Sequence, residues 1–216
     1  MTSRTFIQAE ATDRLAELGL TVELLQRVIR RADAEATTCT ALDPPNLTGF
    51  LRWGRTARFL REELIPAGWG FDNPRNLPRT IHPGGEFAIV ATSGDSATGV
   101  IGFTPTTKYP KGIATVEAVE SNLQLALEFG DDVFGAPGDQ DPADHDNLMT
   151  WILLFHVAED EIRLELSLPD SIIDGQIASW SERIILPALP YSDDPFAGIG
   201  RPDDGEDEVV VEVNRR

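Results

Sequence analysis

The sequence predicts an α+β fold in which N-terminal helices pack against a mostly antiparallel sheet formed largely by the C-terminal half. Two observations carry this prediction. Apolar residues recur at helical spacing through residues 1–67, and two short apolar segments joined by a tight turn follow from about residue 150. Helices that precede strands, rather than alternate with them, are typical of the α+β class. With 216 residues, the chain is long enough for a hydrophobic core and is expected to form one compact domain.

Three helices are expected in the first region, residues 1–67. The first spans 6–18 and ends before Gly19, a residue that is favoured just after a helix. The second begins at the N-cap Thr21 and ends at about Thr37. The third begins near Asn46, and its apolar stripe consists of Phe50, Trp53, Ala57, Leu60 and Leu64. On the same helical wheel, Arg52, Arg55 and Arg58 face solvent.

The second region, residues 68–129, is a glycine- and proline-rich segment that contains one strand, 86–92, and ends in a fourth helix, 113–129. The third region, residues 130–147, contains six Asp, three Gly and two Pro, a composition that predicts an acidic surface linker.

The fourth region, residues 148–192, carries the antiparallel sheet. Segments 150–157 and 161–168 form a hairpin about Glu159 and Asp160, so that the numbers of paired residues sum to 319. This register places the apolar residues of both segments on one face and sets His156 opposite Arg163. A further strand is expected over 183–186, and residues 193–216 form an acidic tail in which 209–213 is a candidate strand.

The charge is segregated along the chain, which points to binding partners. Residues 1–67 are neutral, 68–112 have a net charge of +1, and 113–216 have a net charge of −19. A single cysteine, Cys39, excludes an internal disulfide, and no apolar run reaches the roughly 20 residues that span a bilayer. Together with a polar start, these features predict a cytoplasmic protein without membrane contact. Sixteen arginines against two lysines indicate a GC-rich bacterial genome.

The strongest candidate site is the glycine-rich basic segment. Its six candidate ligand-binding residues are Arg75, Arg79, His82, Thr107, Lys108 and Lys111. Flexible glycines, hydroxyls and cations directly before a helix favour an anion. The spacing matches neither a P-loop nor a dinucleotide fingerprint. We therefore expect a non-enzymatic binding protein for a nucleic acid or a nucleotide, without a cofactor or a metal.

Two alternatives remain open. The tripeptide Gly94-Asp95-Ser96 after an apolar strand resembles the first block of the SGNH/GDSL hydrolases, a resemblance that covers Ile89–Gly99 and implies a nucleophilic Ser96. The D-x-x-H block that supplies the base in that family is missing here. The other alternative is an acidic interaction or inhibitor module, a possible DNA mimic, whose acidic half binds a basic protein.

Overall fold

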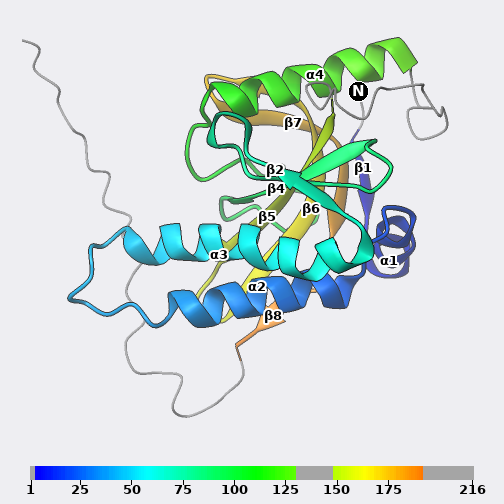
Figure 1. Ribbon diagram of the computed structural model, residues 1–216. Helices are drawn as coiled ribbons and strands as arrows, with labels where there is room; N and C mark the ends of the chain where they lie inside the picture. Colours follow the sequence, from blue (N-terminus) through cyan, green and yellow to red (C-terminus); the bar gives the residue numbers. More distant parts are fainter. Residues whose placement is uncertain (1–2, 130–147, 192–216) are drawn as a thin grey trace, which may run out of the picture.

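The computed structural model describes residues 3–129 and 148–191 (Figure 1). The described part contains four α-helices and one mixed eight-stranded sheet, which confirms the α+β class. The helices are α1 (Gln8–Glu17), α2 (Val22–Ala36), α3 (Leu47–Leu64) and α4 (Ile113–Phe129). The strands are β1 (Arg4–Phe6), β2 (Gly70–Asp72), β3 (Arg79–Ile81), β4 (Phe87–Ser93), β5 (Met149–Val157), β6 (Glu161–Ile173), β7 (Gln176–Ile185) and β8 (Leu189–Pro190).

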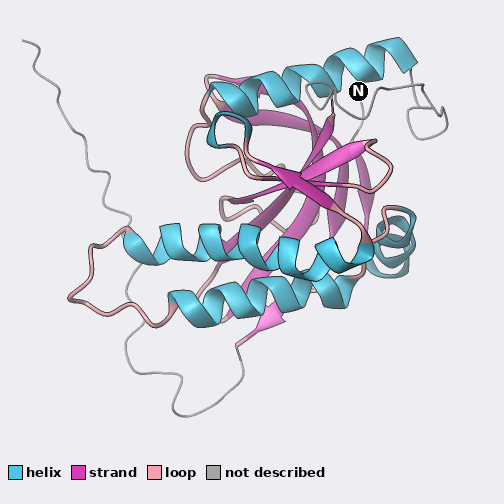
Figure 2. Cartoon of the chain, in the orientation of Figure 1, coloured by secondary structure: helices cyan, strands magenta, loops and turns pink. Residues whose placement is uncertain are grey.

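The sheet follows the order β1-β7-β6-β5-β4-β3-β2, and β8 pairs with the start of β6. Only β4–β5 and β1–β7 are parallel; the other five strand pairs are antiparallel. The hairpin of β5 and β6 has the predicted register, with His156 opposite Arg163 and Leu154 opposite Glu165. Parallel neighbours need a crossover, and α4 lies in the connection between β4 and β5 (Figure 2).

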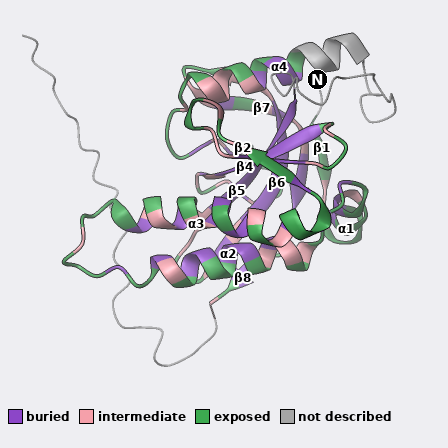
Figure 3. Ribbon diagram, in the orientation of Figure 1, coloured by how far each residue is buried: buried purple, intermediate pink, exposed green. Residues whose placement is uncertain are grey.

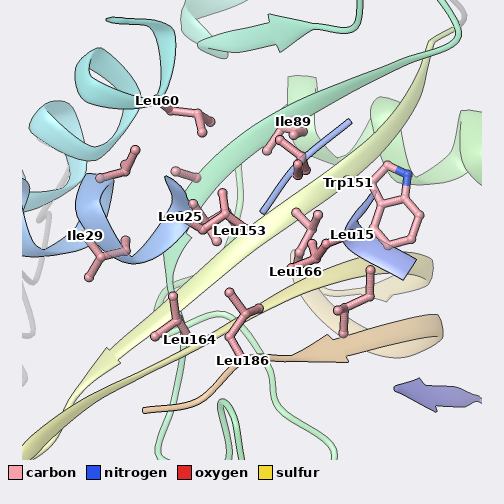
Figure 4. Packing of buried hydrophobic residues seen from close by; sticks show 14 of the residues in the cluster. Leu15, Leu25, Ile29, Leu60, Ile89, Trp151, Leu153, Leu164, Leu166 and Leu186 are labelled. Carbon is pink, nitrogen blue, oxygen red and sulfur yellow. The ribbon is translucent and has the colours of Figure 1, made fainter. Parts of the chain in front are cut away.

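The main core lies between one face of the sheet and the helices α1, α2 and α3. Figure 4 shows Leu25 and Leu60, from α2 and α3, together with Leu153, Leu166 and Trp151 of the sheet. Each of these five side chains is at most 1% exposed. Full burial of one leucine side chain contributes about 1.5–3 kcal/mol, so this cluster, the largest in the described part of the chain, contributes strongly to stability.

The opposite face of the sheet is covered by α4 and by the outer half of the β6–β7 hairpin. Register shifts between Leu168 and Ile172 bend β6 in this region. The bend brings Ile177 and Trp180 of β7 into a second apolar cluster with Ile152 of β5 and Val119 of α4. The sheet is therefore the middle of three layers, with α2 and α3 on one side and α4 on the other (Figure 1).

The predicted stripe on α3 is wrong in its first half. Phe50 is 62% exposed and Trp53 is 36% exposed, although both belong to the predicted apolar face. Arg52, expected in solvent, is buried, and its Nε donates to Asp33 Oδ1 of α2 at 3.0 Å. The side of α3 that carries Arg52 therefore packs against α2, and Phe50 and Trp53 lie on the exposed side. Buried and exposed residues alternate along this helix (Figure 3).

Most of the other expected elements are present. Thr21 caps α2, since its Oγ1 accepts from the backbone N–H of Leu24 at 3.1 Å. The strand expected over 86–92 is β4, and the fourth helix has the predicted bounds. The strand expected over 183–186 is the end of the longer β7. The linker at 130–147 and the tail from 193 lie outside the described residues.

Candidate binding site at the end of β4

The structure distributes the six candidate residues over three places. His82 lies beside the main core, where its ring stacks on that of Phe87 with centroids 4.7 Å apart and contacts the ring of Trp69 edge-on. Its Nδ1 accepts from the backbone N–H of Gly84 at 3.2 Å. Burial lowers the pKa of His82, because it disfavours the charged ring, and Glu86 partly offsets this effect. This environment explains His82 as an aromatic packing residue.

Arg75 and Arg79 share a pocket of about 270 Å³ beside α4. The guanidinium of the buried Arg79 binds both carboxylate oxygens of Asp72, at 2.8 and 2.5 Å. Arg75 forms an ion pair with Glu117 of α4 at the solvent-exposed side. Both positive charges are therefore matched by a carboxylate, which weakens the attraction of this pocket for an anion.

The other three candidates gather at the end of β4. Thr107 is buried and forms a bridge to Gly94, the residue that follows the strand. The backbone N–H of Lys108 donates to Ser93 O at 3.0 Å, and Lys111 Nζ donates to Thr92 Oγ1 at 2.7 Å.

Trp53 joins this group from α3. Its Nε1–H donates to Ala91 O at 3.0 Å, so Trp53, Lys111 and Lys108 are anchored on three successive residues of β4. Tyr109, which is 59% exposed, lies beside Lys108, whose Nζ is 5.7 Å from the centre of the phenol ring. We call Trp53, Lys108, Tyr109 and Lys111 the β4-end patch.

The two lysines of the patch differ from the arginines of the α4 pocket. In the described part of the chain, no carboxylate lies within ion-pair distance of Lys108 or Lys111. Lys111 is half-buried, and burial lowers its pKa to about 8. Its backbone N–H donates to Gly175 O at 2.7 Å, which ties the residue to the turn between β6 and β7.

A buried ion pair holds the loop that carries the lysines. Arg183 of β7 and the fully buried Glu165 of β6 bind each other through two hydrogen bonds, of 3.1 and 2.6 Å. Glu165 also accepts from the backbone N–H of Gly99 at 2.8 Å, and Arg183 donates to the carbonyls of Val100 and Phe103. The loop from 94 to 112 is thereby fastened to the sheet at several backbone groups.

The turn that carries Ser96 lies at the same end of the sheet. The Nδ1 of His156 is 3.3 Å from Gly94 O, and Arg163 donates to Ser96 O at 2.9 Å. Burial is the main cause that lowers the pKa of His156. Among the described residues, no hydrogen bond joins the exposed Ser96 hydroxyl to a histidine, so a nucleophile–base pair is not formed here.

Sequence reasoning missed both aromatic residues of the patch. Trp53 was assigned to the core because it fits the helical period of α3. Tyr109 had a usable signal, since it stands between two lysines in the run Lys108-Tyr-Pro-Lys111. An aromatic residue interleaved with cations is typical of sites that bind single-stranded nucleic acids.

Comparisons with protein-family models, with curated proteins and with solved structures found no match. Within the described ranges, no helix is both long and apolar enough to cross a membrane. Over the same residues, no three His, Cys, Asp or Glu side chains gather as metal ligands.

Proposed function

We propose that this protein binds a phosphate-bearing ligand, a nucleotide or a single-stranded nucleic acid, at the β4-end patch. The observation that supports this proposal is the pair of lysines at the end of β4, which have no carboxylate partner in the described part of the chain. One of them, Lys108, lies beside the exposed ring of Tyr109. Ammonium groups attract phosphate, and an exposed ring offers a surface on which a base stacks, with about 1–3 kcal/mol for each base.

The charge of the whole chain narrows the class of ligand. A net charge of −18 repels a duplex, which presents phosphates along its whole length. A short single strand or a nucleotide needs only a local positive region, and its unpaired bases are free to stack on Trp53 or Tyr109. The α4 pocket is less suitable, because Asp72 and Glu117 match its two arginines.

The direct test is fluorescence polarisation with labelled single-stranded DNA, RNA and duplex DNA over a range of salt concentrations. We expect the single strands to bind better than the duplex and their affinity to fall with salt. The double variant K108Q/K111Q is expected to decrease the slope of log K against log salt by about 1.4, since each phosphate contact of a single strand contributes about 0.7.

Two matched controls locate the site. R75Q removes a cation from the α4 pocket and is expected to change the affinity less than twofold. Y109F keeps the aromatic ring and Y109L removes it, so only Y109L should weaken binding to bases. If R75Q loses binding and K108Q/K111Q keeps it, the ligand belongs to the α4 pocket. If no folded variant or wild type binds any probe, the acidic interaction module becomes the better explanation.

A further inference from the structure

The amine of Lys111 is in an unusual chemical environment for a surface loop. It is half-buried, and the hydrogen-bond partner of its Nζ is the neutral hydroxyl of Thr92, at 2.7 Å. A carboxylate only accepts, and therefore holds a lysine in its charged form. A hydroxyl accepts from an ammonium group and donates equally well to a neutral amine. Thr92 therefore accommodates both protonation states of Lys111.

The surroundings of Lys111 hold the residue in place without compensating its charge. Its backbone N–H is bound to Gly175 O, and a Cβ atom at Gly175 would lie 3.1 Å from the backbone N and O of Lys111. The first turn of α4, which follows directly, contains no acidic residue. Asp174, in the adjoining turn, is exposed to solvent. Burial alone lowers the pKa of Lys111, so a substantial fraction of the amine is neutral near physiological pH.

We propose that Lys111 forms a covalent imine with a phosphate-bearing aldehyde, in which Lys111 supplies the nucleophile and Lys108 contacts the phosphate. The phosphate part of this inference rests on the proposed function, whereas the reactivity of the amine does not. Lys108 lies three residues away on the same loop, and its Nζ is 5.7 Å from the centre of the exposed Tyr109 ring.

The reaction balances without an oxidant or a reductant. The lone pair of the neutral Nζ attacks the carbonyl carbon and forms a C–N bond, while the carbonyl oxygen takes up a proton to give a carbinolamine. Loss of the second proton of the nitrogen, together with the hydroxyl group, releases water and leaves the C=N bond. A lysine that is desolvated in this way is a recognised type of nucleophile for carbonyl compounds.

The chain makes the test simple because Lys108 and Lys111 are its only lysines. The full-length protein is incubated at about pH 7.5 with pyridoxal or with pyridoxal 5′-phosphate, the imine is trapped with sodium borohydride, and the labelled peptides are quantified by mass spectrometry. With pyridoxal, Lys111 should carry about tenfold more label than Lys108, because its half-buried amine is bound to a neutral hydroxyl, and a desolvated lysine is the better nucleophile for a carbonyl. In concentrated urea this preference should disappear, since the fold creates it.

Pyridoxal and its phosphate separate the two proposals. Equal labelling of both lysines by pyridoxal, or a preference that persists in urea, overturns the imine proposal. If Lys111 is preferred, pyridoxal 5′-phosphate should label it faster than pyridoxal does, and K108Q should remove this advantage. If both aldehydes label Lys111 equally well, the reactive amine stands and the phosphate site of the proposed function fails.

Discussion

Lys111 illustrates how partial burial alters a single charged group. In an unfolded chain a lysine has its ordinary pKa of about 10.5, whereas burial in the folded protein lowers the pKa of Lys111 to about 8. Between these values the unfolded state binds more protons than the folded state. The contribution of Lys111 to the free energy of unfolding therefore rises as the pH increases from about 8 towards 10.5, and its destabilising effect is fully present below pH 8.

Because charged Lys111 destabilises the fold below pH 8, we predict a pH-dependent effect of K111M, which keeps the length of the side chain and removes the charge. At pH 7 the free energy of unfolding should increase by about 1 kcal/mol, less than the full shift implies because part of the side chain reaches solvent. At pH 10 the difference should be close to zero. Urea denaturation at both pH values measures it, and an equal effect at both would assign the change to packing.

Phe50, Arg52 and Trp53 show where residue patterns mislead. A helical wheel places large apolar side chains inside and arginine outside, because these are the average preferences. Arg52 of α3 departs from this average preference because Asp33 of α2 accepts a hydrogen bond from its buried guanidinium. Asp33 lies 19 residues earlier in the chain, so the helical pattern of α3 alone cannot predict this ion pair.

At the scale of elements, the sequence pattern predicts a strand correctly where the strand that pairs with it is close in the sequence. The β5–β6 hairpin was predicted to the residue because its turn and both apolar faces agree. β1 was missed because its three residues pair with β7, whose partner residues start at Glu182. β2 and β3 were missed because they are three residues long and lie in a stretch rich in glycine and proline.

The loop 94–112 depends on the ion pair of Glu165 and Arg183. Replacement of Glu165 by leucine leaves the Arg183 guanidinium buried without its carboxylate and should cost about 3–5 kcal/mol of stability. The double variant E165L/R183M removes both charges and should recover most of this loss. Urea denaturation of the two variants checks this order.

The double variant should nevertheless release the loop, because Gly99 loses the acceptor of its N–H and the carbonyls of Val100 and Phe103 lose their donor. Hydrogen exchange of peptides from residues 94–112 should therefore be faster in E165L/R183M than in the wild type. Unchanged exchange in a stable double variant would show that packing alone holds the loop.

At the scale of the whole molecule, the sequence indicated the class of fold and the candidate loop, but not how the loop residues assemble. The six candidates are close in sequence, yet β3 and β4 place them at different ends and faces of the sheet. Only the folded chain shows that Asp72 and Glu117 match the two arginines, while the two lysines bind the end of β4 without a carboxylate partner among the described residues. Composition cannot reveal such pairings, because it counts charges without placing them.

The distribution of charge gives a prediction at this scale. Residues 192–216 carry eight acidic and three basic residues, so a chain that ends at Tyr191 has a net charge of −13 in place of −18. We expect this shortened chain to bind single-stranded oligonucleotides about twofold to fivefold more tightly at low salt, because less negative charge repels the phosphates. At about 0.5 M salt the two affinities should converge through screening. A gain that persists at high salt would instead indicate direct competition for the site.

The outward turn of Trp53 has a practical consequence. The chain has four tryptophans, of which Trp69, Trp151 and Trp180 are at most 5% exposed, whereas Trp53 is 36% exposed. A neutral quencher such as acrylamide therefore reaches one indole far more readily than the other three. The Trp53 indole donates to Ala91 O, and Ala91 directly precedes Thr92, whose hydroxyl accepts from Lys111. If the proposed ligand binds at the β4-end patch, it should decrease the quenching of Trp53 by acrylamide, while the three buried indoles give a nearly constant background.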